Sequence, residues 1–388
     1  MRQLISGIMG QAILRYDVAQ DKKKHENVLL LETKTSSCSL QNYTVYYEVI
    51  GDPDFRPLEV LDGLATTALF WCMENSLDLH VEGRISKRWL QNSNLFMESW
   101  RRWFPEKYRE IVVTADTVVS VATGNENLTH DRETRSVAPF SGGIDSTFSV
   151  LRHNPLAPLL GEASFPISAA VFVHGFDIPI GLDGVANSAK NRLQPLLKKF
   201  KIPMIEVRTN LREVLPLDWE HSHGAALAGV LHQFSHIAAN GLIPSAQSVD
   251  GVLSPWGTHP VTDHDLSGDL MHIVHDGAGF DRLTKTSIVA KNTLAVKGLR
   301  VCWEGPDLDR NCGRCEKCLR TMMALNIAGV DTKKAFGRRI SWEDIKAVEF
   351  RNDRIVDQFN RILLAANSQT NQPHLSWLEA LRVKMGEH

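Results

Sequence analysis

The segment at residues 141–146, with the sequence SGGIDS, constrains the fold of this chain more than any other feature. An apolar run at 136–140 precedes it and a helix-like segment at 147–153 follows it, so the sequence predicts a strand, a glycine turn and a helix in succession. Gly142 and Gly143 let a ligand approach the backbone, and the unpaired N–H groups of the turn and of the first helical turn favour an anion. The segment therefore predicts a phosphate-binding loop. The alternative is an ordinary strand-to-helix turn in which Asp145 is an acidic residue at the helix start.

The pattern SGGxDS resembles the PP-loop of the N-type ATP pyrophosphatases, which cleave ATP between the α- and β-phosphates and attach AMP to a substrate oxygen. It is not a Walker loop, because that loop requires GxxxxGK[ST]. The resemblance implies that Ser141, Gly142, Gly143 and Ser146 hold the departing pyrophosphate, and that Asp145 holds Mg²⁺ or orients the loop. ATP and Mg²⁺ are therefore the expected cofactors.

A second pattern, C-x9-C-x2-C-x2-C, brings together four of the six cysteines of the chain: Cys302, Cys312, Cys315 and Cys318. The two CxxC steps suit one tetrahedral cation, and Gly313 permits a turn that aims backbone N–H groups at sulfur. The pattern predicts a closed, structural Zn²⁺ site. Four thiolates also satisfy a [4Fe–4S] cluster, which is the alternative.

Together the two patterns resemble the 7-cyano-7-deazaguanine synthase (QueC) family. The resemblance extends to residues 283–289 (LTKTSIV) and 302–305 (CWEG), and covers roughly residues 136–330. It implies that Lys285 neutralises charge as the α–β bond of ATP breaks. It also implies that His174 and Phe176, after the second strand of the domain, lie where relatives hold adenine and ribose.

The expected function is that of an ATP-dependent ligase, which adenylates a deazaguanine-type carboxylate or amide and passes it to ammonia or to a protein amine. The added N-terminal region looks more like the QueC-like proteins of bacterial anti-phage systems than like a minimal synthase of queuosine biosynthesis. Residues 220–224 (EHSHG) replace the Arg-Asn helix start of the family, so the substrate stays open. Two alternatives remain: a tRNA-modifying or thiolating PP-loop enzyme, and a non-catalytic nucleotide-binding partner protein.

Composition narrows the class of protein. With 388 residues, 43% hydrophobic and 23% charged, the chain is typical of a globular protein with more than one domain. A net charge of −2 does not indicate nucleic acid as a partner. We expect no membrane span, no secretory segment and a cytoplasmic location, in which the cysteines are kept for metal.

Residues 1–130 are expected to form an accessory α+β domain that recognises a protein partner. Its predicted strands are 28–31, 43–49, 77–81 and 111–113, and its predicted helices are 58–73 and 86–104. The second helix places Trp89, Phe96, Trp100 and Trp103 on one stripe, which favours core packing over a docking face. A polar linker is expected at 123–135.

Residues 136–300 predict a doubly wound parallel-sheet PP-loop domain of the adenine nucleotide alpha hydrolase-like class. Its expected strands are 136–140, 169–173 and 204–207, and its expected helices are 147–153, 186–199 and 225–239. Residues 301–388 predict the zinc segment and a helical cap with helices at 319–328, 342–348, 355–366 and 375–385.

The span 240–281 is expected to be loop-rich, and its histidines and aspartates lack a metal-ligand spacing. Within it, Trp256 offers a stacking surface for a flat heterocycle. His221 and His223, at a helix start, are candidates for substrate contact or are neighbours of a helix cap.

Overall fold

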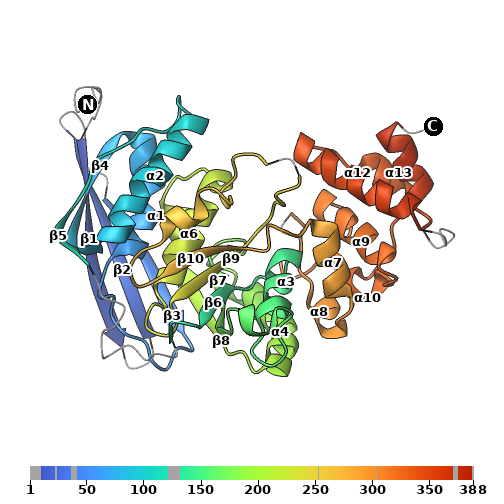
Figure 1. Cartoon of the computed structure of the whole chain (residues 1–388), viewed down its shortest axis with the longest axis horizontal. Coiled ribbons are helices and arrows are strands. Elements are labelled where there is room, and N and C mark those ends of the chain that lie inside the picture. The colour runs from blue at the N-terminus through green and yellow to red at the C-terminus, as the bar shows by residue number, and fades with distance from the viewer. Residues whose placement is uncertain are drawn as a thin grey trace.

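The computed structural model describes residues 10–21, 24–35, 42–120, 132–251, 253–302, 304–369 and 375–386. One ten-stranded sheet runs through most of the molecule in the order β10-β9-β6-β7-β8-β3-β2-β1-β4-β5 (Figure 1). The strands are β1 Gly10–Asp21, β2 Lys24–Thr35, β3 Asn42–Ile50, β4 Leu77–Ser86, β5 Val113–Val119, β6 Ser136–Pro139, β7 Ile167–His174, β8 Met204–Thr209, β9 Asn240–Pro244 and β10 His272–Asp276. Neighbouring strands are parallel except in the pairs β8–β3, β3–β2 and β2–β1.

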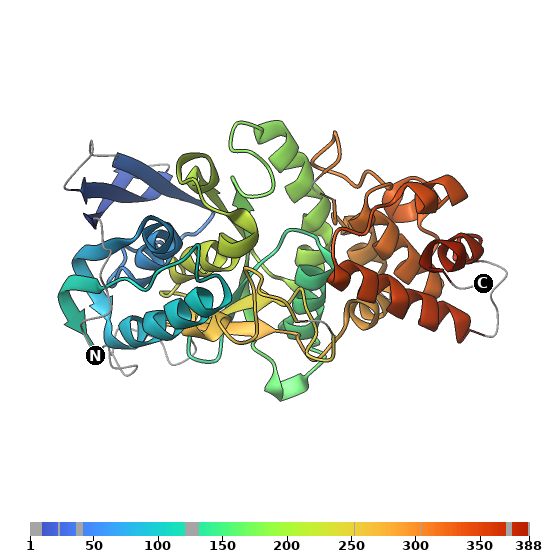
Figure 2. The ribbon, with the colours of Figure 1, turned by 90° about the horizontal axis from the view of Figure 1, so that it is seen from above.

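The helices are α1 Asp62–Asn75, α2 Lys87–Trp103, α3 Ile144–His153, α4 Asp183–Phe200, α5 Leu211–Val214, α6 Trp219–His232, α7 Arg282–Ala290, α8 Thr293–Gly298, α9 Glu316–Ile327, α10 Lys333–Phe336, α11 Trp342–Ala347, α12 Asp353–Asn367 and α13 Leu378–Met385. Helices α9 to α13 gather at the end of the molecule opposite β1 and β5 (Figure 2). This arrangement confirms the expected helical C-terminal region.

The central strands form a parallel sheet that is covered on both faces. Successive residues alternate between two cores, with Val171 of β7 in the core beneath α1 and α6, and Phe172 in the core beneath α3 and α4. From β6 the chain adds β7 and β8 on one side and β9 and β10 on the other, so the strand order reverses at β6. The expected α/β class with a parallel sheet is confirmed, and ligands of such sheets bind at the carboxyl ends of the strands where the order reverses.

The N-terminal strands continue this sheet. Strand β3 pairs antiparallel with β8, with Tyr47 opposite Thr209. On one face α1 packs against α6 at backbone distance, because a Cβ atom added to Gly63 would lie 2.9 Å from the carbonyl oxygen of Gly229. Residues before and after the expected boundary at 130 therefore share a sheet and a core, and the domain division itself stays a prediction.

Several N-terminal elements agree with the expectations. The strands expected at 28–31 and 43–49 are β2 and β3, which pair as an antiparallel hairpin. Helix α2 begins at Lys87 because the Ser86 side chain accepts a hydrogen bond from the N–H of Trp89. Trp89 and Trp100 are fully buried, which confirms core packing for the aromatic stripe.

Other expectations there were wrong or incomplete. Strand β1 was not foreseen, and the strand expected at 111–113 begins only at Val113 and runs to Val119. The helix expected at 58–73 is α1, Asp62–Asn75. The expected linker at 123–135 lies mostly outside the described residues.

The expectation of a loop-rich span at 240–281 was also wrong in part, because it contains β9 and β10. These strands are five residues long and carry Pro, Asn, His and Asp, so their sequence lacks the β-branched runs that mark a strand. Pairing of β9 with β6, and of β10 with β9, decides their conformation instead. Similarly α6 begins at Trp219 rather than at 225, because the Asp218 side chain accepts from the N–H of Glu220 and starts the helix earlier.

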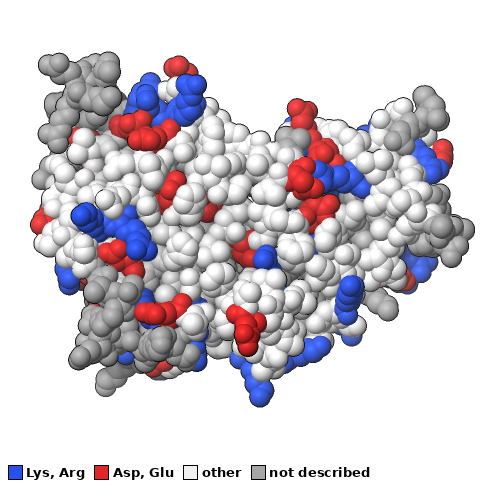
Figure 3. Space-filling model, in the orientation of Figure 1, with Lys and Arg blue, Asp and Glu red and all other residues white. Residues whose placement is uncertain are grey.

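Charges on the surface are mixed in sign. On the face shown in Figure 3, Lys and Arg side chains are interspersed with Asp and Glu side chains. Among the described residues, no helix has both the length and the apolar character needed to cross a bilayer.

Candidate functional site

The glycine loop follows β6, the strand at which the sheet order reverses. Gly142 has a φ of +82°, and a Cβ atom there would lie 2.6 Å from Leu193 Cδ2, so only glycine fits without strain. Its carbonyl oxygen accepts a hydrogen bond of 2.8 Å from the N–H of Arg300. Gly143 precedes α3, and a Cβ there would meet no neighbouring side chain or backbone atom closer than Ser141 Oγ at 3.6 Å. The open side of the loop therefore faces away from the core at the start of a helix, as an anion site requires.

Asp145 lies in the first turn of α3 between two cations of α7. Arg282 donates to Asp145 Oδ2 at 2.7 Å, and Lys285 Nζ lies 3.5 Å from Oδ1. Burial alone would raise the pKa of Asp145, but Arg282 and Lys285 outweigh burial and hold it below its ordinary value. Asp145 is thus an anion, and residues 137 positions apart meet at the loop.

Lys285 is almost completely buried, at 1% exposure. Its ammonium group donates to the carbonyl oxygen of Ser245, directly after β9, at 2.6 Å. Burial lowers the pKa of Lys285, although Asp145 works in the opposite direction. The lysine therefore joins the loop that follows β6 to the loop that follows β9. These two strands are neighbours at the place where the strand order of the sheet reverses.

The two residues expected at the adenine lie at the end of β7, the neighbour of β6. The His174 ring is fully buried, and its Nε2 is 2.9 Å from the carbonyl oxygen of Pro179. Phe176 packs edge-on against Trp219, with ring centroids 4.8 Å apart. Between them Gly175 has a φ of +113° and passes so close to Thr209 that a Cβ would lie 1.8 Å from its carbonyl oxygen. The contact of either residue with a nucleotide stays a prediction.

The four cysteines of the second pattern converge as expected. Their sulfur atoms all lie within 4.8 Å of one another, with Cys302 and Cys315 at 3.7 Å and Cys312 and Cys318 at 3.8 Å. Zn–S bonds of about 2.3 Å in a tetrahedron require sulfur atoms about 3.8 Å apart. A four-iron cluster places an iron atom between each thiolate and the cluster centre, so its cysteine sulfurs lie farther apart. The spacing fits one tetrahedral ion such as Zn²⁺.

The turn at Gly313 also has the expected role. Gly313 has a φ of +70°, and the N–H groups of Arg314 and Cys315 point at Cys312 Sγ at 3.4 and 3.3 Å. Such donors stabilise a metal-bound thiolate. Trp303, in the expected cysteine-aromatic step, lies outside the described residues.

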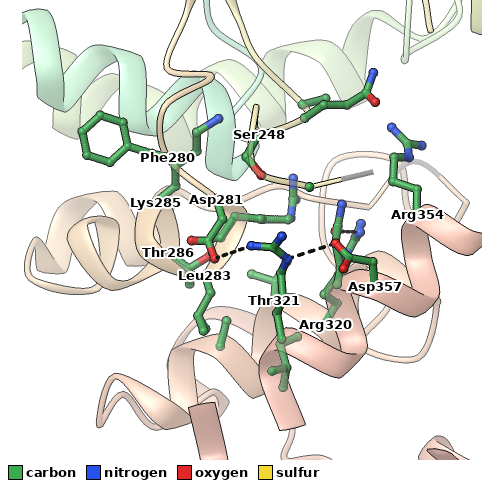
Figure 4. Close-up of a pocket in the computed structure, with 18 residues that line it drawn as sticks. Ser248, Phe280, Asp281, Leu283, Lys285, Thr286, Arg320, Thr321, Arg354 and Asp357 are labelled. Carbon is green, nitrogen blue, oxygen red and sulfur yellow. Dashed lines mark hydrogen bonds and ion pairs between the residues drawn. The ribbon is translucent and has the colours of Figure 1, made fainter. Parts of the chain in front are cut away.

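Sequence reasoning missed a cluster of arginines beside Asp145. Arg320 of α9 and Arg354 and Arg361 of α12 line a cavity with Arg282 and Lys285 of α7. In Figure 4, Lys285 and Asp281 approach this cavity from one side, and Arg320, Arg354 and Asp357 from the other. Arg354, Asp357 and Arg361 follow one another at helical spacing and therefore lie on one face of α12. This spacing was the sequence signal that could have revealed a charged site there.

Trp256 contacts one of the two candidate histidines, His223, whereas His221 lies elsewhere. The Arg354 guanidinium stacks 4.3 Å from the Trp256 ring centroid, and His223 packs edge-on against the same ring. His221 instead faces the N-terminal region, where its Nδ1 lies 2.8 Å from the hydroxyl of Tyr108. Only Trp256 and His223 therefore belong to the side of the molecule that carries Arg354.

Comparisons of the chain with protein-family models, with curated proteins and with solved structures found no match. Functional assignment therefore depends on the side chains that meet at the two sites. Among the described residues, the four cysteines are the one group of three or more His, Cys, Asp and Glu side chains close enough to hold a metal ion. The histidines and aspartates of 240–281 do not form a second one within that part of the chain.

Proposed function

We propose that the chain is an ATP-dependent carbon–nitrogen ligase of the PP-loop pyrophosphatase type. In this proposal a carboxylate or amide oxygen of a small molecule, a deazaguanine-type compound by resemblance, attacks the α-phosphorus of ATP, and pyrophosphate leaves. Ammonia or a protein amine then displaces AMP. The observation that carries the proposal is the glycine loop at the reversal point of the sheet, with Asp145 held between Arg282 and Lys285.

The residues of the loop would bind and orient the β- and γ-phosphates through backbone N–H groups and the hydroxyls of Ser141 and Ser146. The buried ammonium of Lys285 would stabilise the charge that develops when the α–β bond breaks, without having to reorganise. Arg282 would add a second positive charge on the same side. Positioning and charge stabilisation are what phosphoryl-type transfer demands of a protein.

Asp145 fits a Mg²⁺ ion that also contacts the phosphates. One carboxylate together with substrate phosphates is a common magnesium environment, and the Asp145 side chain is 19% exposed. Each of its oxygen atoms has a second lone pair beyond the contacts with Arg282 and Lys285. When bound, Mg²⁺ would neutralise phosphate charge.

A tetrahedral ion at the four cysteines would be structural in this proposal. The cysteine segment follows Arg300, whose N–H holds the carbonyl of Gly142. Asn311, next to Cys312, accepts from the N–H of Val301 at 2.8 Å and donates to the carbonyl of Leu299 at 2.9 Å. An ion that orders the cysteine segment would therefore also stabilise the glycine loop, through the hydrogen bond between Arg300 and Gly142.

The two alternatives are less well supported. A thiolating enzyme needs a reactive cysteine at the site, but among the described cysteines four belong to the metal cluster and Cys72 is buried in the N-terminal core. A protein that only senses ATP has no need to bury Lys285 beside Asp145, which costs desolvation energy. Recognition of a protein partner by residues 1–130 stays a prediction.

The test is the product formed from α-labelled ATP with a 7-deazaguanine carboxylate and ammonia. We expect labelled AMP, and labelled ADP as the sole product would exclude the proposal. Lys285→Met should lower kcat about 10²- to 10³-fold, the usual effect of removing one preorganised charge-stabilising donor. Lys297→Met, on the exposed surface of the next helix, is the matched control and should retain full activity.

A further inference from the structure

We propose that the cavity between α7, α9, α12 and the loop at 246–251 binds a small oxyanion, a carboxylate or a single phosphoryl group, through Arg282, Arg320 and Arg354. This site lies beside the glycine loop but is made largely by helices α9 and α12. Its existence does not depend on the proposed ligase reaction.

The first argument is the balance of charge around the cavity. Arg361 is neutralised by its surroundings, because it forms ion pairs with Asp250, Asp281 and Asp357. The four other cations of the lining are Arg282, Lys285, Arg320 and Arg354. Within the described residues these four form ion pairs with two carboxylates only, those of Asp145 and Glu316. Cations and carboxylates therefore balance overall, but three of the carboxylates gather around Arg361, and the other four cations share only two.

The second argument is that donors in this cluster lack acceptors. The Nε–H groups of Arg282 and Arg320 are buried and have no hydrogen-bond partner within the described part of the chain. Arg320 is 7% exposed, and burial, reinforced by Arg282, lowers the pKa of Arg320 to about 10. Unsatisfied buried donors are costly, so an oxyanion that accepts from these two N–H groups would relieve that cost.

Arg354 is the most informative member of the cluster. Among the described residues its guanidinium has neither an ion pair nor a hydrogen bond, and its one ring contact is with Trp256. Burial lowers the pKa of Arg354, and Glu316 only partly opposes this. Stacking on Trp256 orients the planar guanidinium and leaves its N–H edge available for an oxyanion.

The size of the cavity selects a small group. About 30 Å³ inside it is open to water-sized molecules, so the space between the arginines is small and suits the oxygen atoms of a carboxylate or of one phosphoryl group. Arg361 and its three carboxylate partners join α12 to α7 and to the loop at 246–251, so the wall of the cavity is held in place. The occupant is therefore either the anionic group of a substrate or a phosphoryl group.

The experiment is isothermal titration calorimetry of the full chain without nucleotide, at constant ionic strength in chloride. Inorganic phosphate and acetate are the two probes, and they distinguish a phosphoryl source from a carboxylate source. The main variant is Arg354→Met, which leaves no carboxylate of the described residues without its ion-pair partner and should fold. The control is Arg351→Met, because Arg351 is just before α12 but its side chain is 60% exposed and pairs with Glu304.

We expect a binding event with phosphate, acetate or both that is weakened at least tenfold in Arg354→Met and unchanged in Arg351→Met, whether or not phosphate also binds at the glycine loop. A second variant, Gln358→Glu, puts a carboxylate beside Arg320, which now donates to the Gln358 side chain, and should weaken the same event. The proposal is overturned if the chain binds neither probe up to about 10 mM. Equal affinity of the wild-type chain and Arg354→Met would also overturn it, because the anion would then lie elsewhere. Either result is independent of whether labelled AMP is formed from ATP.

Discussion

Replacement of Asp276 by asparagine tests the main polar contact between β10 and α3. Asp276 is 4% exposed and accepts hydrogen bonds from Ser149 Oγ at 2.5 Å and His153 Nε2 at 3.0 Å, and it pairs with Arg152 at 3.0 Å. The N–H of Phe165 donates to His153 Nδ1, so the ring proton lies on Nε2 and points at Asp276. Three donors thus converge on one carboxylate, whereas an amide offers a single acceptor oxygen.

The expected cost follows from this geometry. Removing one partner of a buried ion pair costs about 3–5 kcal/mol, and we expect about 2–4 kcal/mol here because the Arg152 side chain is 20% exposed. An unfolding entropy of about 2.1 cal/mol/K per residue over 388 residues amounts to about 0.8 kcal/mol/K. Asp276→Asn should therefore lower Tm by about 3–5 °C.

The dependence of this effect on pH is equally specific. Burial alone would raise the pKa of Asp276, but His153, Ser149 and Arg152 outweigh it and hold the pKa below its ordinary value. The contribution of a carboxyl group with a depressed pKa is complete above its unfolded pKa of about 3.9 and is lost as the pH falls through the folded pKa. The difference in Tm between the two proteins should thus be complete at pH 7 and should shrink below about pH 4.

Differential scanning calorimetry of both proteins between pH 3 and pH 8 measures the effect. Asp307→Asn is the control, because the Asp307 side chain is 64% exposed and should leave Tm unchanged. A Tm loss below 1 °C for Asp276→Asn at pH 7, or a loss that does not vary with pH, would refute the reasoning.

Three further predictions concern other parts of the fold. Cys312→Ser should reduce the zinc content, measured by mass spectrometry, from one ion per chain to well below one, and it should lower the yield of folded protein. Iron and a brown colour in protein purified without oxygen would contradict the zinc assignment. Gly224→Ala should cost about 1–3 kcal/mol in denaturant unfolding, since its Cβ would lie 1.8 Å from the carbonyl oxygen of Gly257, while Gly184→Ala, with open space around it, should not destabilise the protein. Arg361→Gln should lower the free energy of unfolding by about 1 kcal/mol and speed amide hydrogen exchange in the loop at 246–251, because three carboxylates lose their common partner. Unchanged exchange in this loop would show that the ion pairs do not hold it in place.

The continuity of the sheet changes how a partner-binding role of residues 1–130 has to be tested. Deleting them would expose the edge of β8, which pairs with β3, and the face of α6 that packs on α1. An exposed strand edge invites aggregation, so such a truncation reports on folding and not on recognition. Point variants on the exposed surface of α2, such as Leu95→Ser at 50% exposure, are the suitable probe.

The sequence by itself determined the features that arise from short-range geometry. Only two residues separate the cysteines of a CxxC step, so a turn with Gly313 at positive φ brings those sulfur atoms together, and all four sulfur atoms lie within 4.8 Å of one another. The strand–glycine–helix order at 136–153 was likewise readable, because it depends on hydrophobic period and on glycine. Parallel strands alternating with helices also predicted the central sheet.

Only the tertiary structure decided which distant residues share a site. Arg282 and Asp145 are 137 positions apart, and Arg361 and Asp250 are 111 positions apart. No local pattern records such contacts, because an arginine in a helix has the same helix propensity whether it faces water, a carboxylate or a cavity. The same holds for β9 and β10, whose five-residue sequences become strands because β9 pairs with β6 and β10 pairs with β9. The glycine loop and the cysteine cluster were thus encoded locally, whereas the arginine cavity and the joining of the N-terminal strands to β8 arise from packing across the described chain.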